Sequence, residues 1–147
     1  MRSGEKLEGI AFFEALYADD VFCRELGRVM LAAGKLEVEI TRYLESSGQT
    51  QKAQQATLGK LIGFAEKDDN LANLTPALKT LNQQRNYLAH NIYALFSSHL
   101  KESLLPKNGL LDSDIDIFSD KARTLSSEIA YLAKVVLKLH NALLSGS

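Results

Sequence analysis

The sequence predicts an all-α fold, an antiparallel helical bundle of about five helices forming one domain over residues 1–147. Long stretches carry apolar residues at alternating steps of three and four, the spacing that places them on one helix face. A chain of 147 residues can bury a core without disulfides, and its single cysteine cannot form one within the chain. Helices with one apolar face bury it by packing together, so a bundle follows.

The first two helices are expected over residues 5–17 and about 20–44. The second has the clearer stripe, made of Phe22, Leu26, Val29, Ala33, Leu36, Ile40 and Tyr43. Gly48 follows it and suits the left-handed conformation that ends many helices. Because Cys23 lies among apolar neighbours on this helix, we expect a buried, reduced thiol.

The middle of the chain predicts a short helix over residues 57–67 and a long one over about 76–100. Thr75 offers a capping hydroxyl before the long helix, and Pro76 suits its first position. The stripe of this helix consists of Leu78, Leu81, Arg85, Leu88, Ile92 and Leu95. Arg85 thus occupies a position where the spacing calls for an apolar side chain, and this misfit needs an explanation.

The last part of the chain contains one irregular segment and one long helix. The helical period disappears over residues 106–118, where we expect a short extended or hairpin-like excursion. The final helix is expected over about 120–144, with the same three-and-four alternation of apolar residues. It completes the set of stripes that the bundle must bury.

Charge and hydropathy narrow the classes of function. A net charge of −1 at pH 7 counts against a protein that coats nucleic acid, which needs many basic contacts to phosphates. It leaves room for a small local RNA site. No apolar run approaches the roughly twenty residues that span a bilayer, and no signal-peptide core is visible. We therefore expect a cytoplasmic protein without a membrane partner.

The candidate functional site is the hexapeptide Arg-Asn-Tyr-Leu-Ala-His at residues 85–90, inside the predicted long helix. Arginine supplies a fixed fork of donors for phosphate, and histidine exchanges a proton near neutral pH. Around a helix Asn86 and His90 lie about 40° apart, whereas Arg85 and His90 diverge by about 140°. The long arginine side chain can bridge that angle, and a second subunit would remove the difficulty.

The hexapeptide resembles the hallmark of the HEPN superfamily, the higher eukaryote and prokaryote nucleotide-binding domains, in which four residues separate an arginine from a histidine. Arg85, Asn86 and His90 match this pattern, and the small bundle with a late motif helix is similar to HEPN architecture. The resemblance implies a metal-independent endoribonuclease with no cofactor. It also implies a homodimer with a shared site, in which His90 is general acid or base, Arg85 clamps the phosphate and Asn86 orients by hydrogen bonding.

The resemblance extends to a biological role as a toxin or a phage-defence component, with an antitoxin or regulatory protein as partner. HEPN toxins that pair with a nucleotidyltransferase antitoxin carry a tyrosine two positions after the motif histidine. Here that position is Ile92, and Tyr93 is displaced by about 100° around the helix. Regulation by tyrosine modification is therefore disfavoured. Tyr93 remains a candidate for the border of the cleft.

Alternative interpretations stay open. The chain is either the ribonuclease or a non-catalytic HEPN-like module that binds a nucleotide, RNA or a protein partner in a regulatory role, which the near-neutral charge favours. At the residue level, a purely structural role would pair Arg85 with a carboxylate and bond His90 within the bundle. His99 and His140 have no companions at metal-ligand spacing, so no metal site is expected.

Overall fold

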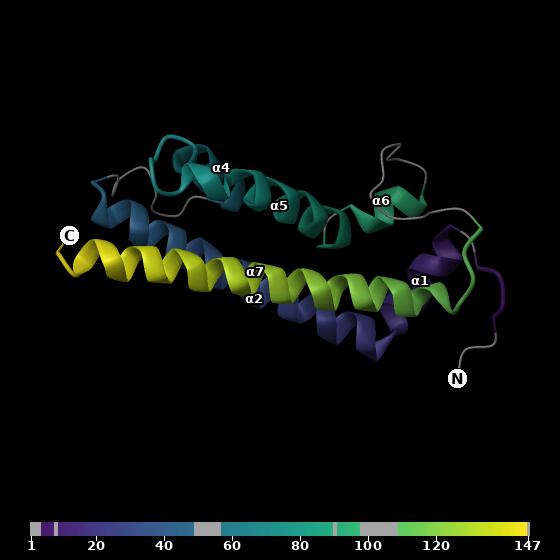
Figure 1. Ribbon diagram of the computed structural model, residues 1–147. Helices are drawn as coiled ribbons and strands as arrows, with labels where there is room; N and C mark the ends of the chain where they lie inside the picture. The colour runs from purple at the N-terminus through teal and green to yellow at the C-terminus, as the bar shows by residue number, and fades with distance from the viewer. Residues whose placement is uncertain (1–3, 8, 49–56, 90, 98–108, 147) are drawn as a thin grey trace. The chain divides into compact units, whose positions relative to one another are not determined.

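The structure is a computed structural model that describes residues 4–7, 9–48, 57–89, 91–97 and 109–146 (Figure 1). These residues form the α-helices α1 (Ile10–Ala18), α2 (Asp20–Ser46), α4 (Leu58–Ala65), α5 (Thr75–Ala89), α6 (Ile92–Phe96) and α7 (Asp114–Leu144), and the 3-10 helix η1 (Ala72–Leu74). Within the described ranges there is no strand, so the predicted all-α helical bundle is confirmed. None of the described helices is long and apolar enough to cross a membrane.

The chain divides into two compact units, which are described separately. Unit 1 consists of Met1–Val29 and Gln83–Ser126, and unit 2 consists of Met30–Asn82 and Ser127–Ser147. The helices α2, α5 and α7 contribute residues to both units. The candidate hexapeptide belongs to unit 1.

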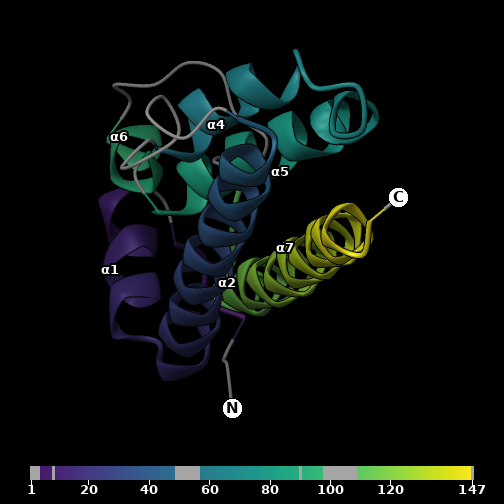
Figure 2. The same cartoon turned by 90° about the vertical axis from the view of Figure 1, so that its left-hand side faces the viewer.

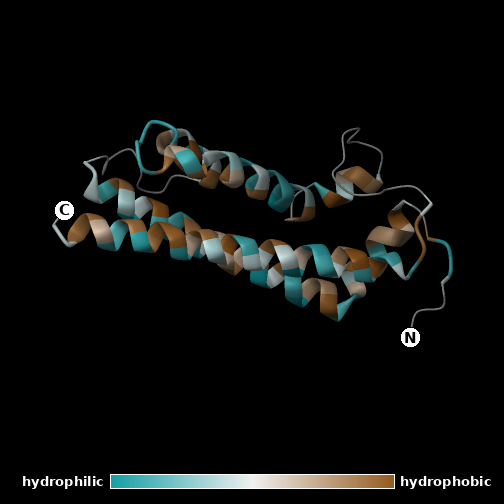
Figure 3. Cartoon of the chain, in the orientation of Figure 1, coloured by the Kyte–Doolittle hydropathy of each residue, from teal (hydrophilic) through white to brown (hydrophobic). Residues whose placement is uncertain are grey.

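Unit 1 has an aromatic core that joins α1, α6 and the first turns of α7. The rings of Phe12, Phe96 and Phe118 are buried, with centroids 5.1 to 6.0 Å apart. Figure 3 shows how apolar α1 and α6 are, and the two helices pack against each other. The predicted start of the first helix is too early, because Gly9 has a φ of 57° and breaks the helical backbone before Ile10.

The segment that leads into α7 is extended only at its beginning. Residues 5–7 and 110–112 pair as a short antiparallel bridge, with backbone hydrogen bonds of 2.9 and 2.7 Å. α7 then begins at Asp114, whose carboxylate accepts the Leu111 N–H at 2.7 Å. The second half of the predicted excursion is therefore helical, because its aspartates suit the positive N-terminal end of a helix. Residues 106–108 lie outside the described part of the chain.

Unit 2 is built on the apolar faces of α2, α4, α5 and α7. Its buried side chains include Leu36, Ile40, Leu58, Leu61, Leu71, Leu78, Ile129 and Val136. Polar contacts tie the elements together: the Tyr43 hydroxyl accepts the Asn70 amide at 2.9 Å, and Ser46 Oγ lies 2.7 Å from His140 Nε2. Within this unit α2 and α5 run in opposite directions, whereas α2 and α7 run in the same direction, so the predicted antiparallel arrangement holds for only part of the bundle (Figures 1 and 2).

The apolar stripe predicted for α2 is confirmed. Its members are buried apart from Leu26, which is half-buried. α2 ends at Ser46, and Gly48 follows with a φ of 96°, the left-handed conformation expected from the sequence. Thr57 precedes α4 as predicted, although its side chain makes no capping hydrogen bond there.

The prediction of a buried Cys23 is wrong. Cys23 is exposed on α2, where its Sγ lies 3.4 Å from the carbonyl oxygen of Tyr17 in the last turn of α1. It neighbours the buried Phe22 in sequence but is rotated by about 100° from it around the helix. Partial burial, followed by the charges of Asp19 and Asp20, raises the pKa of the Cys23 thiol.

Candidate functional site

The helix that carries the hexapeptide ends within it. α5 stops at Ala89, the Asn91 N–H donates to the Asn86 carbonyl at 2.8 Å, and α6 starts at Ile92. A bond that spans six residues is typical of helix C-termini. The predicted continuous helix over residues 76–100 is therefore two helices as far as it is described. The N-terminal end of α5 also differs from the prediction. The Thr75 hydroxyl donates to the Ala72 carbonyl at 2.7 Å and does not cap α5.

Arg85 keeps its predicted place in the apolar stripe. Leu81 lies one turn before it and Leu88 almost one turn after it, and both leucines are buried. Arg85 itself is half-buried, and its Nε atom is withdrawn from solvent. The structure therefore preserves the misfit that the sequence showed: a guanidinium occupies a position on the buried face of α5.

Asn86 and Tyr87 follow Arg85 in the last turns of α5. Asn86 is half-buried, whereas the Tyr87 side chain is buried, so the tyrosine serves the core. His90 lies outside the described residues, and so does His99. The structure thus places Arg85 and Asn86 in succession near the C-terminal end of α5, with side chains about 100° apart around the helix. The position of His90 relative to them stays a prediction.

Tyr93, the candidate border of the cleft, lies on α6 and is 53% exposed. Its ring forms a T-shaped pair with the ring of Phe13 on α1, with centroids 4.8 Å apart and an interplanar angle of 81°. Ile92, at the position where HEPN toxins carry tyrosine, is buried. A tyrosine there would face the core, whereas Tyr93 has a solvent-accessible ring that can contact a bound molecule.

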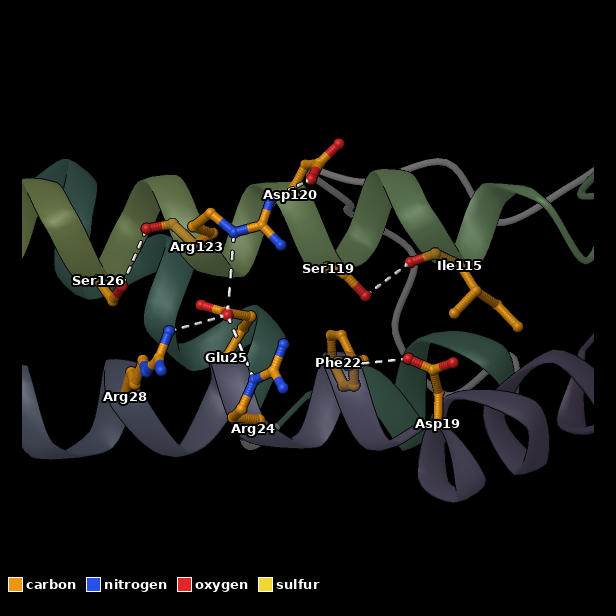
Figure 4. Close-up of polar contacts among 10 residues, drawn as sticks. All are labelled: Asp19, Phe22, Arg24, Glu25, Arg28, Ile115, Ser119, Asp120, Arg123 and Ser126. Atoms are coloured by element: carbon orange, nitrogen blue, oxygen red, sulfur yellow. Dashed lines mark hydrogen bonds and ion pairs between the residues drawn. The ribbon is translucent and has the colours of Figure 1, made fainter. Parts of the chain in front are cut away.

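The structure also reveals a charged cluster that the sequence analysis missed. Glu25 on α2 is buried, and its Oε1 lies 3.1 Å from Arg28, 3.7 Å from Arg24 and 3.8 Å from Arg123 of α7 (Figure 4). Figure 4 shows α2 and α7 running in the same direction past this cluster within unit 1. Arg123 also donates to Asp120 at 2.6 Å. The sequence does indicate part of this cluster, because Glu25 is flanked by two arginines, Arg24 and Arg28, that stand one turn apart on α2.

Among the described residues, neither a metal site nor a likeness to a known protein identifies further site residues. Among the side chains that the structure describes, no group of three histidine, cysteine, aspartate or glutamate residues could hold a metal ion. A comparison with known proteins found no matching family model, curated protein or solved structure. Function is therefore inferred from the residues of the chain itself.

Proposed function

We propose that the chain is a metal-independent endoribonuclease of HEPN type that acts in the cytoplasm as a homodimer with a shared site. The observation that supports this is Arg85, which is half-buried between Leu81 and Leu88 on the apolar stripe of α5. A guanidinium costs stability where an aliphatic side chain would fit. Recognition of a phosphate group explains why an arginine occupies this position, and Asn86 beside it supplies a second polar contact.

The proposed reaction is transesterification of the RNA backbone. A general base removes the proton of a 2′-hydroxyl, the 2′-oxygen attacks phosphorus, and the bond from phosphorus to the 5′-oxygen breaks. A general acid protonates the departing 5′-oxygen, which leaves a 2′,3′-cyclic phosphate and a 5′-hydroxyl end. His90 serves as acid or base, Arg85 stabilises the charge that develops on the phosphoryl oxygens, and Asn86 orients the reacting groups.

A homodimer supplies the second proton-transfer group. Each hexapeptide contains one histidine, whereas the reaction needs both an acid and a base. Two-fold symmetry would bring two copies of Arg85, Asn86 and His90 to one groove, with one histidine in each role. Tyr93, exposed on α6, is proposed to border this groove.

The test is incubation of purified protein with mixed cellular RNA in EDTA, followed by analysis of the product ends. Wild type should leave 2′,3′-cyclic phosphate or 3′-phosphate ends, and His90→Ala should lower the rate at least about a hundredfold. His140→Ala is the matched control, because His140 contacts Ser46 in unit 2 and has no proposed role. Full activity of folded His90→Ala protein would contradict the proposal.

The proposed biological role is that of a toxin or a phage-defence component, held in check by an antitoxin or another regulatory protein. Expression of wild type should then arrest growth, whereas expression of His90→Ala should not. Stable binding of RNA or a nucleotide by folded wild type, with no turnover, would instead support a non-catalytic HEPN-like module. The EDTA experiment separates these outcomes.

A further inference from the structure

We propose that Arg24, Arg28 and Arg123 form a phosphate-binding site in unit 1, separate from the hexapeptide and held together by Glu25. The three guanidinium groups converge on one buried oxygen, Glu25 Oε1, at distances of 3.7, 3.1 and 3.8 Å (Figure 4). The Glu25 side chain is 2% exposed, whereas those of the arginines are 52 to 61% exposed. A buried carboxylate thus gathers three solvent-accessible cations, Arg28 by a hydrogen bond and Arg24 and Arg123 by longer ion-pair contacts.

The charge of the cluster is unbalanced. Three arginines carry three positive charges, Glu25 provides one negative charge, and Asp120 provides a second one at the rim through its 2.6 Å contact with Arg123. Arg24 and Arg28 stand four residues apart on α2, where two like charges repel each other. A bound anion would neutralise the remaining positive charge and relieve this repulsion.

A second buried glutamate on α2 provides a comparison for the number of arginines around Glu25. Glu39 in unit 2 has a side chain that is 7% exposed, and Arg42 contacts its Oε1 at 3.4 Å. This repeats the three-residue spacing of Glu25 and Arg28. Among the described residues, Glu39 is paired with one arginine, whereas Glu25 gathers three arginines around a single oxygen.

The geometry selects phosphate as the ligand class. Each guanidinium has five N–H donors in a rigid fork, and a single carboxylate oxygen engages few of them. The remaining donors come from two helices and suit a tetrahedral anion, which accepts several charge-assisted hydrogen bonds at once. The phosphate can belong to an RNA strand or to a small phosphorylated molecule, and the experiment distinguishes these sources.

The experiment measures binding of two probes by titration calorimetry: inorganic pyrophosphate and a short 2′-O-methyl oligoribonucleotide. The latter lacks the 2′-hydroxyl that the proposed ribonuclease requires, so it stays intact. The Arg28→Gln, Arg123→Gln double variant should bind at least about tenfold more weakly for each arginine removed. For the oligoribonucleotide, the slope of log affinity against log salt should fall by about one per lost contact.

The matched control is Arg42→Gln, which removes an equally exposed arginine from the same kind of pair with a buried glutamate. It should leave binding unchanged. Urea unfolding must show that each variant is folded, because Glu25 and Glu39 are buried carboxylates that lose arginine partners in these variants. Selective loss of oligoribonucleotide binding identifies an RNA strand, and selective loss of pyrophosphate binding identifies a small ligand. Absence of binding by wild type, equal binding by the double variant or an equal loss in Arg42→Gln would overturn the proposal. This experiment measures binding of probes that are not cleaved, whereas the ribonuclease proposal is tested by cleavage in EDTA, so failure of either proposal is separately detectable.

Discussion

Arg85→Leu distinguishes a functional arginine from a structural one. The substitution completes the apolar stripe of α5, because Leu81 and Leu88 flank the position and are both buried. If Arg85 serves phosphate recognition, the fold gains an apolar contact while RNA cleavage is lost. If Arg85 serves the fold through a buried ion pair, its loss destabilises the protein.

The two roles predict different free energies of unfolding. Full burial of a leucine stabilises by about 1.5–3 kcal/mol, and a half-buried position gives about half of that. Loss of a polar partner at this half-buried position costs about 0.5–1.5 kcal/mol. For a functional arginine, the net change is therefore within about 1 kcal/mol of zero. Breaking a buried ion pair that supports the fold would cost about 3–5 kcal/mol.

The assay combines urea unfolding, followed by circular dichroism, with RNA cleavage in EDTA. Leu81→Ala calibrates the unfolding measurement, because truncating this buried residue of the same stripe should cost about 2–5 kcal/mol. We expect Arg85→Leu to unfold close to wild type and to be inactive. A loss of more than about 3 kcal/mol would refute the functional interpretation of the misfit. Full cleavage activity would refute the assignment of Arg85 as a phosphate clamp.

Three further predictions concern the stability of the fold and the reactivity of Cys23, and they use described residues of α1 and α2. Phe12→Ala removes a ring from the aromatic core of unit 1 and should lower the free energy of unfolding by about 3–5 kcal/mol. Tyr17→Ala changes a side chain that is 74% exposed and should alter the free energy of unfolding by less than about 0.5 kcal/mol. Asp20→Asn should lower the raised pKa of the Cys23 thiol, because the negative charge of Asp20 favours the neutral thiol. Alkylation of Cys23 at mildly alkaline pH should then be faster, and an unchanged alkylation rate would contradict this. Gly34→Ala should stabilise by about 0.5–1 kcal/mol in urea unfolding, since the added Cβ meets no described atom within 4 Å beyond its chain neighbours and the nearby backbone of α2. Destabilisation would contradict that open surface.

The long helices could be predicted because burial of one face leaves a regular signal in the sequence. Every residue of the α2 stripe falls on the inner side except the half-buried Leu26, and the end of α2 is marked by Gly48. Helix boundaries were less predictable, because they depend on contacts between distant segments. α7 begins at Asp114, next to a bridge that pairs residues 110–112 with residues 5–7 near the N-terminus.

The break between α5 and α6 shows a different limit. Apolar spacing continues through Leu88, Ile92 and Leu95, and all three are buried, so the pattern resembles one helix. Asn91 is nevertheless not helical, so α5, which is described as far as Ala89, and α6, which begins at Ile92, are separate helices. Two short helices can bury the same stripe as one long helix, and therefore periodicity alone does not distinguish them.

Periodicity reveals a charged residue only where it replaces an apolar one. Arg85 could be recognised because the stripe of α5 needs an apolar residue at its position. Glu25 escaped recognition because Leu26, beside it, already fits the stripe of α2. Arg123 reaches Glu25 from α7, so the sequence near Glu25 could not show that a third arginine completes the cluster.

The two proposed phosphate contacts differ in the kind of binding energy they can supply. Arg24, Arg28 and Arg123 are held by Glu25 whether or not a ligand is present, so they would bind a substrate and its transition state equally. Arg85 is proposed to act on the charge that develops during reaction, and its effect would therefore appear in kcat. A half-buried position restricts Arg85 to one small region, as selective recognition of a reacting phosphate requires. The exposed cluster can bind a phosphate equally well in the ground state and in the transition state. It is therefore suited to capturing a ligand and not to accelerating a reaction.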